Sequence, residues 1–467
     1  MDDLETKIKT HFAGNVVGKG LMRKAGLEFL PRYVSEFILG TFVEEGESED
    51  HVISKAKKFV NHYVPEPNTS DLMRHKLLDE GKIKLLARYK VKVDLHSQIY
   101  EAKVPVLNES VLFDPHFVDL YPSLLTTGMW GLGILMYNPA ENGKFKVELA
   151  DFKPFQIGAF DVTEFFEARQ HFSLEEWMAV LLTSMGLNPQ SLQTSEQIFI
   201  LCRLLPLIRR NLNMAEFGPK STGKTYVFRN HSSYAHVVSG SAVTPAKLII
   251  DLKSNTPGLI STTDLIVFDE ITGAEFGKTQ DFELIGLLKD YMEGGHVSRG
   301  RAQITEDSSL MFLGNIDIRK NSPKYEDYVR ELPRAFSDPA FVDRINGFIP
   351  GWKIPKISQI EESLSESVGL MSSYLGEALH ALRRLDHPDM DWSKVEKDFK
   401  MVRNEKSVRK ITEGLLMLLF PGVAVKEKEI NFCLEIACNL RQYVYDQLHF
   451  LDPDEFPKFK LSARFIE

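Results

Sequence analysis

The first third of the chain changes its hydrophobic pattern at about residue 80. Apolar residues recur at helical spacing up to about residue 75, as in the run Tyr33–Leu39. Between about 80 and 160 apolar and polar residues alternate instead, as in Tyr100–Leu107, which is typical of half-buried strands. The pattern therefore predicts an N-terminal α+β domain over residues 1–165 that contains a small β-rich module.

The remaining two thirds of the chain predict an α/β domain followed by helices. Ser173 with Glu176 three residues later forms a capping-box signature, and it opens a helical stretch. Apolar strand-like runs and helical stretches then alternate up to about residue 350, which favours a mainly parallel sheet. Helical spacing returns near residue 358, with a strongly periodic run at Val408–Phe420. We expect an α/β domain at 166–355 and a helical lid domain at 356–467.

Composition and charge limit the partners that can be expected. The chain has 467 residues and a formal net charge of −9, so basic residues that bind nucleic acid would have to be gathered locally. Its start, MDDLETKIKT, has no apolar core of the secretory type, and its longest apolar run is interrupted by Pro421. The three cysteines lack disulfide or metal-site spacing. We therefore expect a cytoplasmic protein without a membrane partner.

A phosphate-binding loop is the first motif that carries chemistry. The stretch GPKSTGKT follows a short apolar segment and precedes a helical one, which is the context such a loop requires. Backbone N–H groups of the loop and the start of the helix bind phosphate oxygens, Lys224 reaches the β- and γ-phosphates, and Thr225 contributes a hydroxyl to Mg²⁺. The residues expected to bind the nucleotide are Gly218, Pro219, Lys220, Ser221, Thr222, Gly223, Lys224 and Thr225.

Two further strands predict that the bound nucleotide is hydrolysed. The apolar run Leu265–Phe268 ends in Asp269 and Glu270, so a buried strand would bring Asp269 to Mg²⁺ and Glu270 to a water molecule. A nucleotide-binding switch does not need a base at this position, whereas activation of the attacking water does. The strand Leu310–Gly314 ends in Asn315, which is a candidate for positioning that water. The sequence predicts an ATP hydrolase that uses Mg²⁺.

The order of these motifs resembles that of the AAA+ ATPases, and this resemblance adds two arginines. The segment Pro339–Ile345 is similar to the arginine-finger segment of Lon and MCM proteins, which implies that Arg344 contacts the nucleotide of a neighbouring subunit. The segment Ser407–Ile411 is similar to a sensor-2 segment, which implies that Arg409 contacts the γ-phosphate in its own chain.

A third segment resembles a DNA-binding element of MCM helicases. Tyr291–Ala302 is similar to their pre-sensor hairpin, with Arg301 at the position of the basic residue that enters the channel and Arg299 beside it. Two arginines at a hairpin tip can bind a DNA backbone through its phosphates without reading sequence. Ser239–Thr244 is similar to the segment that precedes the MCM helix-2 insert.

Over nearly all of residues 1–450 the chain resembles the BrxL family, the Lon-like AAA+ proteins of bacterial BREX phage-defence systems. The stretches that carry the resemblance are HFAGNVVGKG, FSLEEWMAVLLTSMG, KDYMEGG and FVDRINGFIPGWKIPK. It implies a hexamer-like ring of identical copies, stacked rings, double-stranded DNA in the channel, and other BREX defence proteins as partners. Longer relatives carry a protease domain with a Ser-Lys dyad, for which this sequence offers no candidate segment, so we do not expect proteolysis by this chain alone.

Three functions remain open at this point. The first is a ring-shaped ATPase that encircles double-stranded DNA and couples hydrolysis to clamping or translocation. The second is a protein unfoldase that feeds a separate protease, with Phe276 and Gly277 as its pore loop. The third is a module in which ATP only locks assembly, and the Asp269–Glu270 pair argues against it.

Overall fold

The computed structural model forms two compact units, which are described separately. One unit comprises residues 13–160 and 370–374, and the other comprises residues 1–12, 161–369 and 375–467. This division places the predicted α/β region and all of the predicted lid region except residues 370–374 in one unit, and the three domain boundaries stay predictions. The structure describes residues 2–43, 47–66, 68–138, 147–155, 160–239, 243–253, 256–273, 279–334, 336–357, 361–386 and 390–466.

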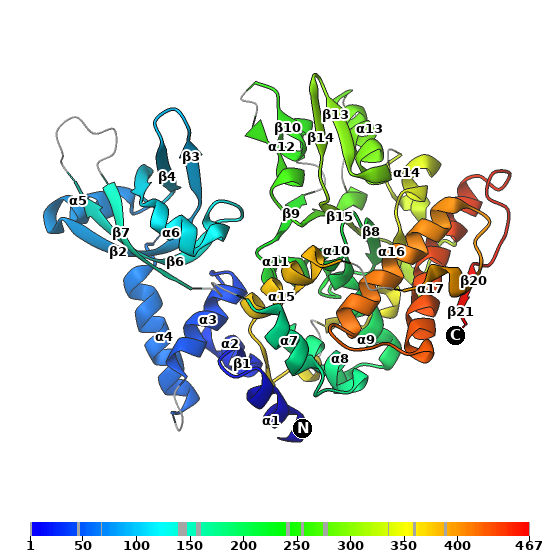
Figure 1. Ribbon diagram of the computed structural model, residues 1–467, viewed down its shortest axis with the longest axis horizontal. Helices are drawn as coiled ribbons and strands as arrows, with labels where there is room; N and C mark the ends of the chain where they lie inside the picture. The colour runs from blue at the N-terminus through cyan, green and yellow to red at the C-terminus, as the bar shows by residue number, and fades with distance from the viewer. Residues whose placement is uncertain are drawn as a thin grey trace. The chain divides into compact units, whose positions relative to one another are not determined.

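The smaller unit is an α+β structure with a six-stranded sheet, in the order β2-β6-β7-β5-β4-β3 (Figure 1). Its strands are β2 (Lys82–Tyr89), β3 (Val91–Asp94), β4 (Ile99–Val104), β5 (Glu109–Phe113), β6 (Met129–Tyr137) and β7 (Val147–Pro154). Its main helices are α2 (Lys19–Ala25), α3 (Arg32–Phe42), α4 (Glu49–Tyr63), α5 (Ser70–Glu80) and α6 (Pro115–Leu120). The predicted β-rich module is confirmed.

Strands β2 and β6 pair antiparallel along their length. Successive side chains of these strands point to opposite faces of the sheet, and the core of this unit lies on both faces. Leu85 and Tyr89 face one hydrophobic cluster, whereas Leu86 faces a second one formed with the helices. Glycines in β6 allow aromatic rings to lie across the sheet, because a Cβ at Gly133 would be 2.5 Å from the Tyr89 hydroxyl oxygen.

The larger unit is built on a five-stranded parallel sheet, which confirms the predicted α/β core. Its order is β18-β8-β15-β12-β9, and neighbouring strands pair in parallel throughout. These strands are β8 (Met214–Gly218), β9 (Ala235–Ser239), β12 (Leu265–Asp269), β15 (Ser309–Asn315) and β18 (Gly347–Pro350). β8, β12 and β15 read as nearly continuous apolar runs because parallel strands are covered on both faces.

Helices surround this sheet (Figure 1). The helices are α8 (Leu174–Ser184), α9 (Thr194–Leu201), α10 (Leu205–Ile208), α11 (Lys224–Asn230), α13 (Thr279–Gly294), α14 (Pro339–Asp343), α15 (Ser372–Arg384), α16 (Val402–Leu419) and α17 (Glu427–Leu451). The last two, α16 and α17, form the C-terminal lid. The capping box predicted for α8 is present: Ser173 Oγ accepts from Glu176 N at 3.1 Å, and Glu176 Oε2 accepts from Ser173 N at 2.8 Å.

The first helix, α1 (Asp2–His11), packs in the larger unit. Lys7 Nζ lies 2.6 Å from Glu176 Oε1, and the Phe12 ring lies against Phe172 and Trp177. Within the described ranges, no helix combines the length and the apolar character that a bilayer crossing requires.

Candidate nucleotide-binding site

The phosphate loop connects the buried strand β8 to the start of α11. Ser221 and Gly223 adopt left-handed backbone conformations, with φ of 70° and 73°, so the chain turns tightly before the helix begins. Gly218 is required by close approach, since a Cβ there would lie 2.5 Å from the backbone carbon of Gly351. The loop therefore has the shape that its sequence predicts.

The Lys224 side chain lies inside this loop. Its Nζ donates to the carbonyl oxygens of Gly218 and Pro219, both at 3.0 Å, to Gly314 O at 3.3 Å and to Asn315 Oδ1 at 3.0 Å. Burial lowers the pKa of Lys224 to about 8, and Glu216 and Asp269 partly oppose this shift. An ammonium group surrounded by four oxygen acceptors can exchange some of them for phosphate oxygens.

Thr225 and Asp269 meet at the next position along the loop. Thr225 Oγ1 donates to Asp269 Oδ1 at 3.0 Å, and Arg229 Nη2 lies 3.5 Å from Asp269 Oδ2. A hydroxyl and a carboxylate oxygen in contact are the ligand types that Mg²⁺ takes beside phosphate. These two residues fit the predicted metal site.

Glu270 follows Asp269 at the end of β12 and is exposed at the pocket. Its φ of 56° lies in the left-handed region, which a residue with a side chain adopts at a cost of about 1–2 kcal/mol. Such strain persists where the surrounding structure holds the residue in place, and it is common at functional sites.

Asn315 closes the pocket from the neighbouring strand. β15 pairs with β8 so that Asn315 lies opposite Gly218, and the Asn315 backbone N–H donates to Thr272 Oγ1 at 3.2 Å. The pocket has a volume of about 340 Å³. Its lining includes Lys220 to Thr225, Asp269, Glu270 and Asn315, so these predicted residues form one site, although their roles stay predictions.

The sequence analysis missed a buried ion pair beneath the loop. Arg203 donates to both carboxylate oxygens of Glu216, at 2.8 and 2.7 Å, and its Nη2 also donates to Thr222 O at 3.1 Å. Neither side chain of the pair is exposed. By binding one carbonyl of the loop, the pair helps to fix the backbone of the loop. A glutamate in the middle of an otherwise apolar strand, MAEFG, is the signal that could have revealed it.

Arg344 and Arg409 lie in a second pocket, of about 340 Å³, which shares no lining residue with the phosphate-loop pocket. Arg344 Nε lies 3.2 Å from Glu293 Oε2, and Arg344 Nη1 donates to Ala340 O at 2.7 Å. Arg409 Nε donates to Glu413 Oε1 at 2.9 Å, and its guanidinium lies over Trp392. Arg409 is therefore not at the phosphate loop of its own chain, in contrast to the contact expected from the sensor-2 resemblance.

Arg299 and Arg301 lie on a hairpin of β13 (His296–Arg299) and β14 (Ala302–Thr305). Arg301 is exposed in its turn, beside Gly300 with φ of 60°. Arg299 is instead held at the base of the turn, where its Nε donates to Glu283 Oε1 at 3.2 Å and its Nη1 donates to Ile250 O at 2.6 Å. The two arginines therefore do not form the paired tip that the sequence suggested.

Two of the sequence predictions fall on undescribed positions. Phe276 and Gly277, the proposed pore loop, lie outside the described residues, as do residues 240–242 of the segment similar to the MCM insert.

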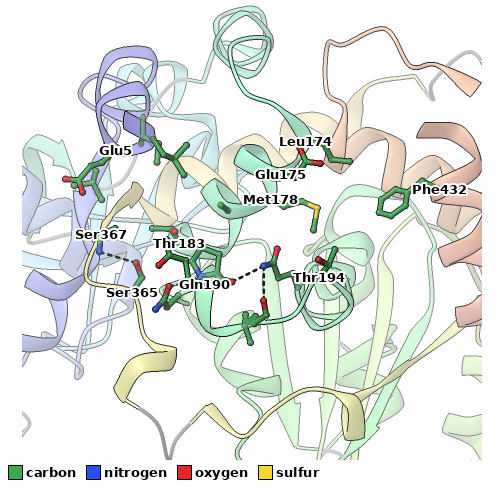
Figure 2. A pocket seen from close by; sticks show the side chains of 18 of the residues that line it. Glu5, Leu174, Glu175, Met178, Thr183, Gln190, Thr194, Ser365, Ser367 and Phe432 are labelled. Atoms are coloured by element: carbon green, nitrogen blue, oxygen red, sulfur yellow. Dashed lines mark hydrogen bonds between the residues drawn. The ribbon is translucent and has the colours of Figure 1, made fainter. Parts of the chain in front are cut away.

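The larger unit also contains a cavity of about 790 Å³ that none of the predicted residues line. It lies between α1, α8 and the start of α17, and Figure 2 shows Met178 and Phe432 among the side chains that line it, together with polar ones such as Gln190 and Thr194. Its lining offers no phosphate-binding loop, so the nucleotide chemistry belongs to the smaller pocket.

Comparison with known families assigns both parts of the chain. Residues 147–462 match the family described as "Lon-like protease BrxL-like, ATPase domain". The chain belongs to the BrxL family. Residues 10–137 match the N-terminal domain that is described as part of the BREX system Lon protease-like protein BrxL. The BrxL ATPase domain thus contains both pockets and the β13–β14 hairpin.

Two curated BrxL proteins are similar over the whole chain. "Lon-like protease BrxL" of Escherichia coli O9:H4 (strain HS) is 31% identical over 477 residues, which cover 100% of this chain and 67% of the relative. The protein of the same name from Bacillus cereus (strain H3081.97) is 31% identical, and the match covers 98% of this chain and 68% of the relative. Among solved structures, a full-length MCM homolog from Methanopyrus kandleri gives a TM-score of 0.43 at 10% identity, covering 78% of this chain and 77% of that one.

Proposed function

We propose that this BrxL-family ATPase forms a ring around double-stranded DNA and couples ATP hydrolysis to clamping or translocation of the duplex in BREX phage defence. The observation that carries the proposal is the separation of the two pockets. Lys224, Thr225, Asp269 and Asn315 share one pocket, whereas Arg344 lies in another. A complete hydrolytic site then needs a second copy of the chain.

The phosphate-loop pocket would hold ATP with Mg²⁺. Thr222 Oγ1 is buried without a hydrogen-bond partner, and the described hydrogen bonds of the Lys224 ammonium go to neutral acceptors, so both groups can serve a phosphate. Mg²⁺, when bound, would neutralise phosphate charge. In this chain Lys224 would bind phosphate, Thr225 and Asp269 would hold the metal, Glu270 would take a proton from the attacking water, and Asn315 would orient that water.

The second pocket would receive the triphosphate of the neighbouring copy. Its lining includes a cluster of basic side chains: Arg209, Arg344, Arg403, Lys406, Arg409 and Lys410. An interface that joins one pocket of a copy to a different pocket of the next copy is head-to-tail, and such interfaces close into rings when the rotation allows it. We propose that Arg409 as well as Arg344 acts across this interface, in a hexamer-like ring that can stack on a second ring.

The affinity for ATP should depend on pH through Lys224. Because its pKa is lowered to about 8, the free site loses the lysine charge above that pH, and phosphate binding must restore the proton. Affinity should therefore be constant below pH 8 and fall by up to about tenfold per pH unit above it, with proton uptake on binding. Calorimetry in buffers of different ionisation enthalpy measures both effects. Lys224→Ala should bind weakly at every pH, and a wild-type affinity that is unchanged up to about pH 9.5 would contradict this assignment.

DNA would be bound by the exposed Arg301. Arg301→Ala should weaken duplex binding and flatten its salt dependence, because fewer DNA phosphates are then neutralised, with little change between DNA sequences. Arg299→Ala should weaken binding less on its own, because Arg299 is tied to Glu283 and to Ile250 O. Fluorescence anisotropy over a salt series is the measurement, with Lys458→Ala, another exposed basic position, as the control.

The same variants separate DNA binding from the alternative function. If Arg301→Ala together with Arg299→Ala leaves duplex binding unaltered while the unfolding of a protein substrate is lost, the chain acts as an unfoldase for a separate protease. If duplex binding is lost, the DNA function stands, and other BREX proteins are the partners to test by co-purification.

A further inference from the structure

We infer that Glu293 is a positioning residue whose carboxylate pairs with Arg344 until a phosphate group of the neighbouring copy's nucleotide takes the place of that carboxylate. Through this ion pair, helix α13 links Arg344 to the β13–β14 hairpin. This inference rests on the proposed function of the second pocket. Glu293 is the one acidic side chain among the described residues that line this pocket. A carboxylate among so many cations takes the place that an anionic ligand would take.

The ion pair between Glu293 and Arg344 is suited to exchange. Arg344 Nε lies 3.2 Å from Glu293 Oε2, and the two side chains are 21% and 46% exposed. The Arg344 Nε atom is buried and makes no hydrogen bond within the described part of the chain, so this contact is an ion pair alone, and ion pairs between partly exposed side chains contribute little stability. A phosphate accepts from arginine in a bidentate and more strongly charged arrangement. A neighbouring nucleotide can therefore displace Glu293.

The carboxylate keeps a second partner when Arg344 leaves. Arg403 Nη2 donates to Glu293 Oε2 at 2.6 Å, and Arg403 also pairs with Asp343, the residue before Arg344. Asp343 in turn accepts from the buried Arg441 at 2.6 Å. Arg403 thus holds the Glu293 carboxylate beside Arg344, and the exchange needs no charge to be left unpaired.

Helix α13 connects this ion pair to the hairpin at both of its ends. Glu293 lies in its last turn, and Gly294 and Gly295 alone separate it from β13. The connection is tight, because Gly295 has a φ of 79° and a Cβ there would lie 2.3 Å from Glu306 O. Near the start of the same helix, Glu283 pairs with Arg299 of the hairpin. A DNA phosphate that binds the hairpin can therefore shift helix α13, which carries Glu293.

Two consequences follow from this linkage. Loss of the Glu293 charge should free Arg344 in the absence of DNA, and DNA should free it in the wild-type chain. If DNA raises turnover by releasing Arg344 from Glu293, a chain that lacks this ion pair leaves DNA nothing to release, so the stimulation by DNA should shrink.

The test measures ATP turnover of Glu293→Gln with and without a DNA duplex. We expect kcat without DNA to rise about two- to fivefold, the range that an exposed ion pair supports, with KM for ATP unchanged, and the stimulation by DNA to fall by the same factor. Asp290→Asn removes one carboxylate charge from an exposed position of the same helix and should change neither quantity. Thermal melting and sedimentation of each variant establish that fold and assembly are retained.

Unchanged turnover and unchanged DNA stimulation in Glu293→Gln would overturn the inference, as would an equal effect of Asp290→Asn or a wild-type rate that DNA does not alter. Arg344→Ala distinguishes this failure from that of the proposed function. If Arg344→Ala retains full turnover, the trans role of Arg344 is wrong. If it abolishes turnover while Glu293→Gln has no effect, only the role of Glu293 is wrong.

Discussion

Glu270→Gln should bind ATP as the wild-type chain does and hydrolyse it about 10²–10⁴-fold more slowly, which is the usual contribution of a positioned general base. Glutamine keeps the length and shape of the side chain but accepts no proton from the attacking water. Glu270 is exposed in the pocket that contains Lys224. None of the described hydrogen bonds joins its side chain to a residue that would bind the nucleotide, so the substitution should leave ATP binding intact. Single-turnover hydrolysis and nucleotide affinity, measured on the same preparation, separate chemistry from binding.

Asp269→Asn provides the matched comparison. Asp269 accepts from Thr225 Oγ1 and is the carboxylate assigned to Mg²⁺, so its loss should weaken binding of the metal–nucleotide complex as well as hydrolysis. Equal turnover in Glu270→Gln and the wild type would remove Glu270 from the role of base. A loss of affinity in Glu270→Gln that matched the loss in Asp269→Asn would place Glu270 with the ligands instead.

Much of the nucleotide pocket could be predicted from the sequence because its chemistry is local. Lys224 and Thr225 belong to one continuous motif, and its glycines permit the tight turns of the loop. Asp269 and Asn315 come from elsewhere in the chain, but each ends a strand of the same parallel sheet. The carboxyl ends of parallel strands meet at one edge, so an apolar run that ends in a polar residue is enough to place that residue there.

The ion pairs around the pocket could not be predicted in the same way. The Arg203–Glu216 pair depends on how the segment after α9 packs under β8, and no local motif specifies that contact. Arg299 looks like a free hairpin residue in the sequence, yet the position of Glu283 on α13 holds it in place. The position of Arg409 depends on how α16 packs near the end of α13. A resemblance of five residues to a sensor-2 segment does not determine that packing. Such pairings between distant residues arise from packing, and they decide which arginine is available to a ligand.

Arg344→Ala should reduce ATP turnover about 10³-fold or more, as loss of an arginine supplied in trans does in related nucleotide hydrolases. The physical reason is that, in the proposed ring, Arg344 of the neighbouring copy would neutralise charge on the transferred phosphoryl group in the transition state, in addition to Lys224. Since Arg344 lies in a pocket that shares no residue with the phosphate loop, nucleotide affinity of the separate chain should change little. Steady-state turnover and nucleotide affinity are the two measurements.

Mixing experiments test the direction of this contribution. Arg344→Ala copies retain the phosphate loop, and Lys224→Ala copies retain the arginine, so each variant alone should be inactive. In mixed rings, about one interface in four joins an intact loop to an intact arginine, and turnover should return to about that fraction of the wild-type rate. Mixed rings that stay as inactive as either variant would argue that Arg344 acts on the nucleotide of its own chain. The position of the second pocket, with Arg344 and Arg409 both away from Lys224, makes restoration the expected result.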